Sequence, residues 1–124
     1  MRKTTLYMVA AVLTVVLGVG CSLISIVNRV ERETRELALR TTLNHTRKAI
    51  DQFWVVKGAL PRSLDDLVSM KLMDKIPVDP VTNTEEWQLV IGTKSKGSKQ
   101  MSGIVDLHST SSAISSEGTP YNTW

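Results

Sequence analysis

The feature that most constrains this chain is an apolar run close to its N-terminus. No charged side chain occurs between Lys3 and Arg29, and from Leu6 to Val27 the only polar side chains are a few hydroxyls. As an α-helix, this run would rise about 1.5 Å per residue and cover roughly 30 Å, the thickness of the hydrocarbon core of a bilayer. We therefore predict a membrane-spanning helix over residues 4–28.

The flanking charges predict the orientation of this helix. Arg2 and Lys3 precede the apolar run, whereas the flank after it mixes arginines with glutamates. The positive-inside tendency then places the N-terminus in the cytoplasm and everything after Asn28 on the other side of the membrane. Residues 1–3 are a short basic leader or the cytoplasmic end of the helix.

Two alternatives concern the fate of this N-terminal segment. A cleaved secretory signal has a shorter apolar core than this run. The residues from Gly18 to Cys21 resemble a relaxed lipobox, although Gly18 stands where a Leu is usual. Cys21 is therefore a lipidation candidate, and the favoured interpretation is that it is a small apolar residue inside a retained helix. As the single cysteine, it also excludes an intrachain disulfide.

The helix is predicted to continue over residues 29–57 as an amphipathic segment. No Pro or Gly occurs in this stretch, and opposite charges four residues apart, such as Arg29 with Glu33, support a helix. Gly58 and Pro61 are typical of its end. One stripe with helical spacing is predicted to be buried, and it contains Leu39, Leu43, Thr46, Ile50, Phe53 and Lys57.

A helix from residue 4 to residue 57 would be roughly 80 Å long. A small domain cannot cover such a length, so the helix either packs against copies of itself or serves as the stalk of an anchored protein. We favour self-assembly. The predicted assembly face of the helix consists of Leu13, Leu17, Leu39, Leu43 and Ile50.

Residues 58–124 are predicted to form a small head. A short helix should follow Ser63, and residues 87–91 and 103–108 read as antiparallel strands joined by a loop over residues 92–101. The fold class is α+β, with the long helix packed on a small antiparallel sheet, because two strands alone are marginal in water. Tyr121 and Trp124 should fold back over an edge of the sheet. The predicted core of the head is Phe53, Trp54, Leu67, Trp87, Val90 and Val105.

Three short segments carry a family resemblance. They are GALP at residues 58–61, IPVDP at residues 76–80 followed by Trp87, and GTPY at residues 118–121. In order and spacing the chain resembles the major, G-type pseudopilins of type II secretion and, more broadly, the type IV pilin-like proteins. The resemblance implies a pilin-like fold in the bacterial inner membrane with a periplasmic head. It also implies helix-to-helix assembly with further copies or other pseudopilins as part of a secretion machinery, with no enzymatic activity.

The resemblance does not extend to the front of the chain. Counting without gaps places Lys3, Thr4 and Met8 where the family has a Gly, an aromatic residue and a Glu around the site of a prepilin peptidase. Met8 offers no carboxylate to pair with a neighbour's amino terminus. The departure favours an unprocessed, anchored pseudopilin-like subunit. The alternative function is a monomeric membrane-anchored or lipidated periplasmic binding protein with a pilin-like fold.

Residues for catalysis and ligand binding are sparse. His45 lies on the predicted helix, and His108 follows Asp106 and precedes Ser109 at the end of a strand without a further sign of a catalytic site. We expect no catalytic residues, no cofactor and no small-molecule substrate. The net charge of +3 is spread along the chain with one modest lysine cluster over residues 94–99, so we expect no nucleic-acid partner.

One metal site is implied by the resemblance alone. G-type pseudopilins often hold calcium near their last strands, and in that region this chain has oxygen donors at Asp106, Ser109, Ser111 and Glu117. Calcium usually takes six to eight oxygen ligands with several carboxylates, and only two of these residues are acidic. The four residues are weak calcium candidates, and a Ser-rich surface loop is the favoured interpretation.

Overall fold

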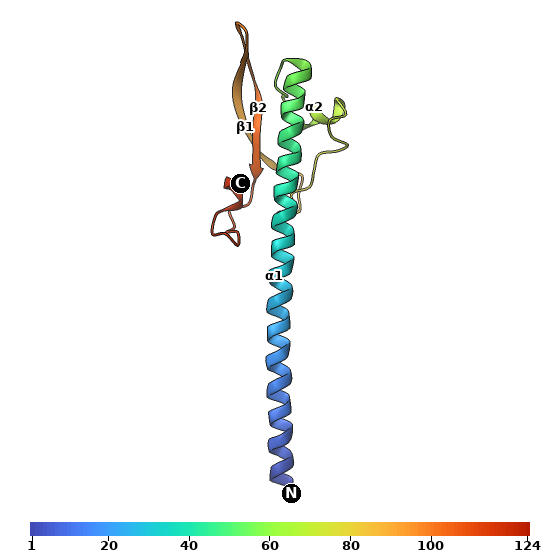
Figure 1. Ribbon diagram of the computed structural model, residues 1–124, viewed down its shortest axis with the longest axis vertical. Coiled ribbons are helices and arrows are strands. Elements are labelled where there is room, and N and C mark those ends of the chain that lie inside the picture. Colours follow the sequence, from blue (N-terminus) through green and yellow to red (C-terminus); the bar gives the residue numbers. More distant parts are fainter. The chain divides into compact units, whose positions relative to one another are not determined.

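The computed structural model describes residues 1–124 as an α+β chain with one long helix and a small antiparallel sheet. This layout confirms the coarse fold class predicted from the sequence. In chain order the elements are α1 (Arg2–Lys57), α2 (Leu64–Ser69), β1 (Trp87–Lys96), β2 (Lys99–Ser109) and the short 3₁₀ helix η1 (Tyr121–Thr123), as labelled in Figure 1.

The chain divides into two compact units, Met1–Thr34 and Arg35–Trp124. The N-terminal unit is helical, and α1 is long and apolar enough to cross a membrane. Its few hydroxyl groups bond within the helix: Thr14 Oγ1 donates to the carbonyl of Ala11 at 2.8 Å, and Ser22 Oγ to that of Gly18 at 3.0 Å. These bonds satisfy polar groups that hydrocarbon could not hydrate.

In the C-terminal unit, α1 ends where the sequence stops favouring a helix. The amide of Gly58 donates to the carbonyl of Trp54 at 2.8 Å, and Gly58 has a φ of +64°, the left-handed conformation that favours glycine. The chain then turns through Pro61 into α2. Ser63 and Asp66 form a reciprocal capping box at the start of that helix.

The core of the C-terminal unit lies between one stripe of α1 and the elements that follow it. Figure 1 shows the hairpin of β1 and β2 on one side of α1 and α2 on the other. Burial of this apolar stripe is what stabilises the helix in water. The buried apolar side chains include Leu39, Leu43, Ile50 and Phe53 of α1, Leu64 and Leu67 of α2, Trp87 of β1, Ile104 and Leu107 of β2, and Tyr121 of η1.

The two strands are longer than predicted, and the predicted loop over residues 92–101 is wrong. β1 and β2 pair from Trp87 with Ser109 out to Lys96 with Lys99, which leaves a two-residue turn. Gly97 has a φ of +63° in this turn, at the position where a tight hairpin favours glycine. This segment is rich in Ser and Lys and therefore has no apolar strand pattern. It pairs nevertheless, because the hydrogen bonds between strands come from the backbone.

Part of the predicted core also needs correction. Phe53, Leu67 and Trp87 are buried, but Trp54, Val90 and Val105 are only half-buried. The register shifts between Val90 and Ile91, because their partners are Asp106 and Ile104 and Val105 is the extra residue of a bulge. A bulge re-aims the side chains that follow it, so β2 buries Ile104 and Leu107 instead.

The hairpin also approaches the loop that leaves α1. The amide of Ile104 donates to the carbonyl of Pro61 at 2.8 Å. A Cβ at Gly103 would lie 2.6 Å from the Cβ of Leu60 and 2.7 Å from the Pro61 carbonyl oxygen. Glycine at this position therefore allows β2 to dock on the 60–61 segment.

Candidate functional site

The residues from 113 onward fold back onto α1 and define a candidate site in the C-terminal unit. The carboxylate of Glu36 on α1 accepts hydrogen bonds from the Ser116 amide at 2.7 Å and from the Tyr121 hydroxyl at 2.8 Å, and also from the Ser116 hydroxyl. Glu36 is only 6% exposed. A buried carboxylate is tolerated because hydrogen bonds replace its lost hydration.

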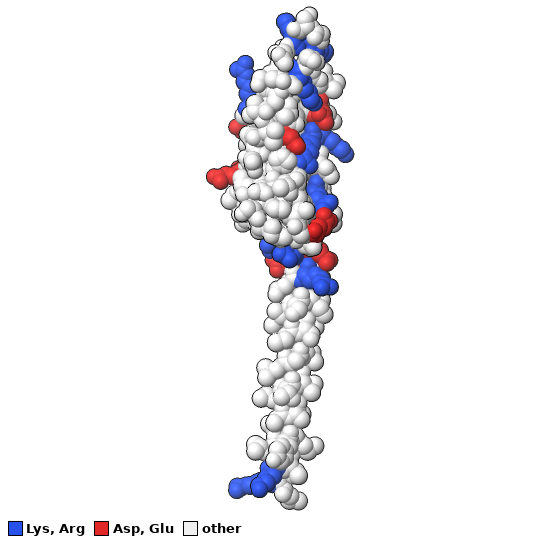
Figure 2. All heavy atoms as spheres, turned by 90° about the vertical axis from the view of Figure 1, so that its left-hand side faces the viewer, with Lys and Arg blue, Asp and Glu red and all other residues white.

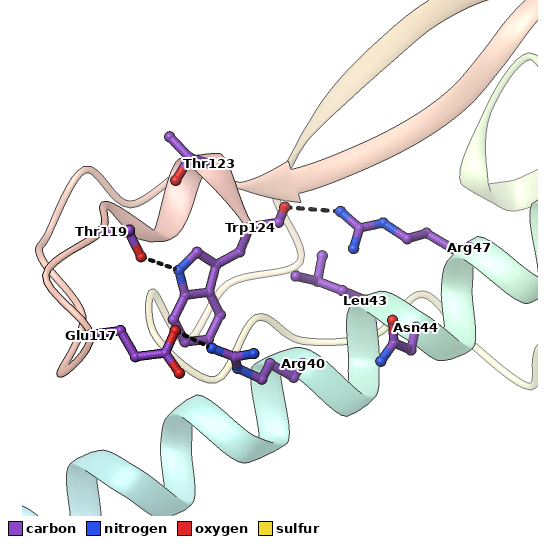
Figure 3. Close-up of a pocket in the computed structure, with 8 residues that line it drawn as sticks. All are labelled: Arg40, Leu43, Asn44, Arg47, Glu117, Thr119, Thr123 and Trp124. Atoms are coloured by element: carbon purple, nitrogen blue, oxygen red, sulfur yellow. Dashed lines mark hydrogen bonds and ion pairs between the residues drawn. The ribbon is translucent and has the colours of Figure 1, made fainter.

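A second contact lies one turn further along α1. Arg40 forms an ion pair with Glu117 at 2.6 Å, and its guanidinium lies 4.2 Å from the centre of the Trp124 ring. The indole N–H of Trp124 donates to Thr119 Oγ1 at 2.9 Å, and its ring meets Tyr121 edge to face. Figure 3 shows this Trp124 ring between the Glu117 loop and α1.

Arg47 joins β2 and the last residue of the sequence to α1. Its Nε donates to Asp106 Oδ1 at 2.6 Å, and its Nη2 donates to the main-chain oxygens of Leu107 at 3.1 Å and Trp124 at 2.9 Å. The Nδ1 of His108 contacts the same Trp124 oxygen. The guanidinium fork thus satisfies one side-chain carboxylate and two main-chain oxygens from different segments.

An open hollow of ≈ 340 Å³ lies among these residues (Figure 3). Because Arg40 and Arg47 are each paired with a carboxylate, the hollow offers mainly neutral hydrogen-bonding groups beside an aromatic ring. It suits a small polar segment better than a free anion. Its lining consists of Arg40, Leu43, Asn44, Arg47, Glu117, Thr119, Thr123 and Trp124.

The structure gives each of the four calcium candidates its own partner within the chain. Asp106 pairs with Arg47, and Glu117 pairs with Arg40. The Ser109 hydroxyl donates to the buried Asp79, and Ser111 Oγ accepts a bond from the Ala113 amide at 3.3 Å. The structure therefore does not bring these oxygen donors together around one point.

The histidines are also placed in separate surroundings. His108 Nε2 lies 3.8 Å from Asp106 Oδ2, while Ser109 is turned away to Asp79. His45 is exposed on α1 beside Met73 and Pro77. The sequence order of Asp106, His108 and Ser109 thus does not become a hydrogen-bonded row.

The predicted assembly face of α1 requires a correction. Leu13 and Leu17 are 60% and 63% exposed, as such a face requires. Leu39, Leu43 and Ile50, by contrast, are at most 1% exposed, because the chain's own α2, β2 and η1 cover them. These three residues belong to the core. The lipidation candidate Cys21 is exposed on the N-terminal unit.

Sequence reasoning missed two buried carboxylates. Glu36 lies in a run of alternating charges that is typical of a solvated helix, and its partners follow 80 or more residues later. Asp79 is fully buried, where Oδ1 accepts from the Val81 amide at 2.8 Å and Oδ2 accepts from Ser109. The Pro residues around Asp79 indicate a turn but give no sign of burial.

Comparisons of this chain with protein-family models, curated proteins and solved structures find no match.

Proposed function

We propose that this chain is a non-enzymatic structural subunit, anchored in the inner membrane by α1 and assembled helix to helix with further copies. The assembly we propose is a pseudopilus of type II secretion or a related pilin-like filament. One observation carries the proposal: the apolar side chains of the N-terminal unit are exposed throughout the 18-residue window that is long enough to span a membrane, which is 0% buried. Such a surface needs lipid or other helices around it.

The C-terminal unit covers one face of its own part of α1, so that face is not available for contacts between copies. It buries its own stripe of α1 and ties its last residues down by Glu36, Arg40 and Arg47. It therefore needs no second copy in order to fold. Assembly is then left to the N-terminal unit and to the outer surface of the C-terminal one.

Cys21 provides a direct test, because it is the single cysteine and is exposed. Oxidation of membranes containing the full chain should give disulfide-linked dimers through Cys21. Cys21→Ser should abolish these dimers, and a relocated cysteine at Leu17 should restore them. A chain that stays monomeric with a cysteine at position 21, 17 or 13 would contradict helix-to-helix assembly.

The alternative is a monomeric membrane-anchored or lipidated binding protein, and the hollow beside Trp124 is the feature that favours it. The intact mass of the membrane-extracted protein separates the cases: unprocessed, cut after Lys3, cut and acylated at Cys21, or cut elsewhere. Our proposal expects one of the first two masses. Cleavage before Cys21 with acylation of its thiol would remove most of the spanning segment and would support the alternative.

A further inference from the structure

The hairpin of β1 and β2 carries opposite charges at its two ends. Glu85 and Glu86 directly precede β1 at the base of the hairpin, whereas Lys96 and Lys99 flank the turn at its tip, where they are cross-strand partners. Because β1 has 10 residues, the two ends lie roughly 30 Å apart. The hairpin is therefore a charged element with an acidic base and a basic tip.

The basic tip is extended by the end of α1 and lacks acidic partners. The Nζ of Lys96 reaches over the end of α1, 3.4 Å from where a Cβ at Gly58 would lie, next to the exposed Lys57. Lys94 is already paired with Asp51 at 3.1 Å. Lys57, Lys96 and Lys99 have no carboxylate at ion-pair distance. Figure 2 shows Lys and Arg, without Asp or Glu, at this end of the C-terminal unit.

The acidic base is equally unpaired. Both Glu85 and Glu86 are exposed, and neither side chain makes an ion pair within the chain. No Lys or Arg occurs between Lys75 and Lys94, so the half of β1 next to Glu85 and Glu86 carries no cation. Two free carboxylates at one end thus match two free ammonium groups at the other.

We propose that the basic tip of one copy docks on the acidic base of a second copy, with Lys96 and Lys99 facing Glu85 and Glu86. The inference rests on the proposed function, and it names the contact between the C-terminal units. Like ends repel, so charge selects the head-to-tail arrangement over a symmetric pair. A head-to-tail contact uses two different patches of each copy, so it can repeat without closing and is compatible with a filament.

The geometry separates this contact from simple lateral packing. Tip and base lie at opposite ends of the hairpin, so the two C-terminal units must be displaced along it by about one hairpin length, roughly 30 Å. Two copies side by side at the same height bring tip to tip and base to base. A disulfide between tip and base would therefore be formed only by subunits that are displaced along the hairpin.

The test is disulfide trapping between two differently tagged full-length chains, both in a Cys21→Ser background. The chains are mixed in detergent micelles, because a shared bilayer would hold the two C-terminal units at the same height. One chain carries Ser98→Cys in the turn, and the other carries Gln88→Cys, an exposed position beside the acidic base. We expect mixed dimers from the tip and base cysteines. Their yield should fall when NaCl is raised from about 50 mM to about 500 mM, because salt shortens the range of exposed charges.

Charge reversal identifies the residues. Lys96→Glu with Lys99→Glu should lower the trapped yield by about twofold to thirtyfold, the range expected for two exposed ion pairs. Glu85→Lys with Glu86→Lys should do the same. Chains that carry all four changes should recover the yield, since the two charge patterns are then exchanged. The matched control is Lys71→Glu with Lys75→Glu, two exposed lysines elsewhere, which should leave the yield unchanged.

Three results would overturn the proposal. The first is a trapped yield in either double charge reversal that equals the yield of the unreversed chains. The others are no recovery of the yield in chains with all four changes, and a tip-to-tip dimer of Ser98→Cys as the main product. Loss of binding to phosphatidylglycerol vesicles by Lys96→Glu with Lys99→Glu, without recovery by exchange, would show that the tip meets lipid instead. Cys21 dimers of the parental chain in membranes distinguish failure of this contact from failure of the proposed function. If they persist while tip trapping fails, only this contact is wrong; if they are absent as well, the proposed function fails.

Discussion

The hydroxyl of Tyr121 donates to the Glu36 carboxylate at 2.8 Å, although 85 residues separate the two. This bond and the two from Ser116 hold the side-chain carboxyl group of Glu36 inside the C-terminal unit. They also fix where the last segment of the chain lies on α1. The contact is therefore a sensitive point at which to test the structure.

Removing the Glu36 carboxylate should destabilise the C-terminal unit. Glu36→Ala leaves the buried Tyr121 hydroxyl without its acceptor, which should lower the free energy of unfolding by about 1–3 kcal/mol. Glu33→Ala, which removes an exposed glutamate one turn earlier, should change it by less than about 0.5 kcal/mol. Urea unfolding of the full chain in detergent, followed by tryptophan fluorescence, measures both. A double-mutant cycle with Tyr121→Phe should show coupling, and strict additivity would contradict the bond.

A comparison of Leu43 and Leu37 tests which face of α1 is buried in the core. Leu43 is 1% exposed and Leu37 is 67% exposed. Leu43→Ala should therefore cost about 2–5 kcal/mol of unfolding free energy, because it leaves a cavity in the core. Leu37→Ala should cost less than about 0.5 kcal/mol. If both variants lost the same free energy of unfolding in the same urea titration, the chain would not bury the apolar stripe of α1 that contains Leu43.

Gly103 should not tolerate a side chain. A Cβ would lie 2.6 Å from the Leu60 Cβ and 2.7 Å from the Pro61 carbonyl oxygen, and the backbone cannot move away without losing the docking of β2. Gly103→Ala should cost about 1–3 kcal/mol, as overpacking usually does. Ser102→Ala, at the exposed neighbouring position, serves as the control. Wild-type stability in Gly103→Ala would show that β2 does not pack on this segment.

Leu13→Glu tests whether the apolar part of α1 spans a membrane. A carboxylate near the bilayer centre should cost on the order of 2–3 kcal/mol and should impair insertion. The same change at Leu37, which is exposed on the C-terminal unit, should leave membrane association intact. Carbonate extraction and flotation of membranes measure the bound fraction. If Leu13→Glu fractionates like the parent, α1 does not span the membrane.

The helix and its end were readable from the sequence for physical reasons. An uncharged run of membrane length and an uninterrupted helical pattern up to Gly58 need no knowledge of distant partners. Strand length was underestimated, because residues such as Thr93 and Ser95 pair through their backbone without an apolar signature. The bulge at Val105 then misled the assignment of inward-facing residues, since alternation assumes an unbroken register.

The candidate site was less predictable. The sequence pattern of an apolar stripe, such as the one with Leu39 and Leu43, does not tell whether the same chain or a second copy buries it. The partners of Glu36 and Arg47 lie 59 to 85 residues further along the sequence, so local spacing carries no trace of them. Local patterns, in short, predicted elements well and long-range polar contacts poorly.

The Glu36 contact also has a consequence for biosynthesis. Ribosomes release α1 long before Ser116 and Tyr121 exist, so a carboxylate destined for the interior and the leucines beside it meet water first. Only when the later segment has been translated can the unit close. A newly made chain therefore passes through an interval with an open, sticky flank, during which a chaperone or a protease would have its best access.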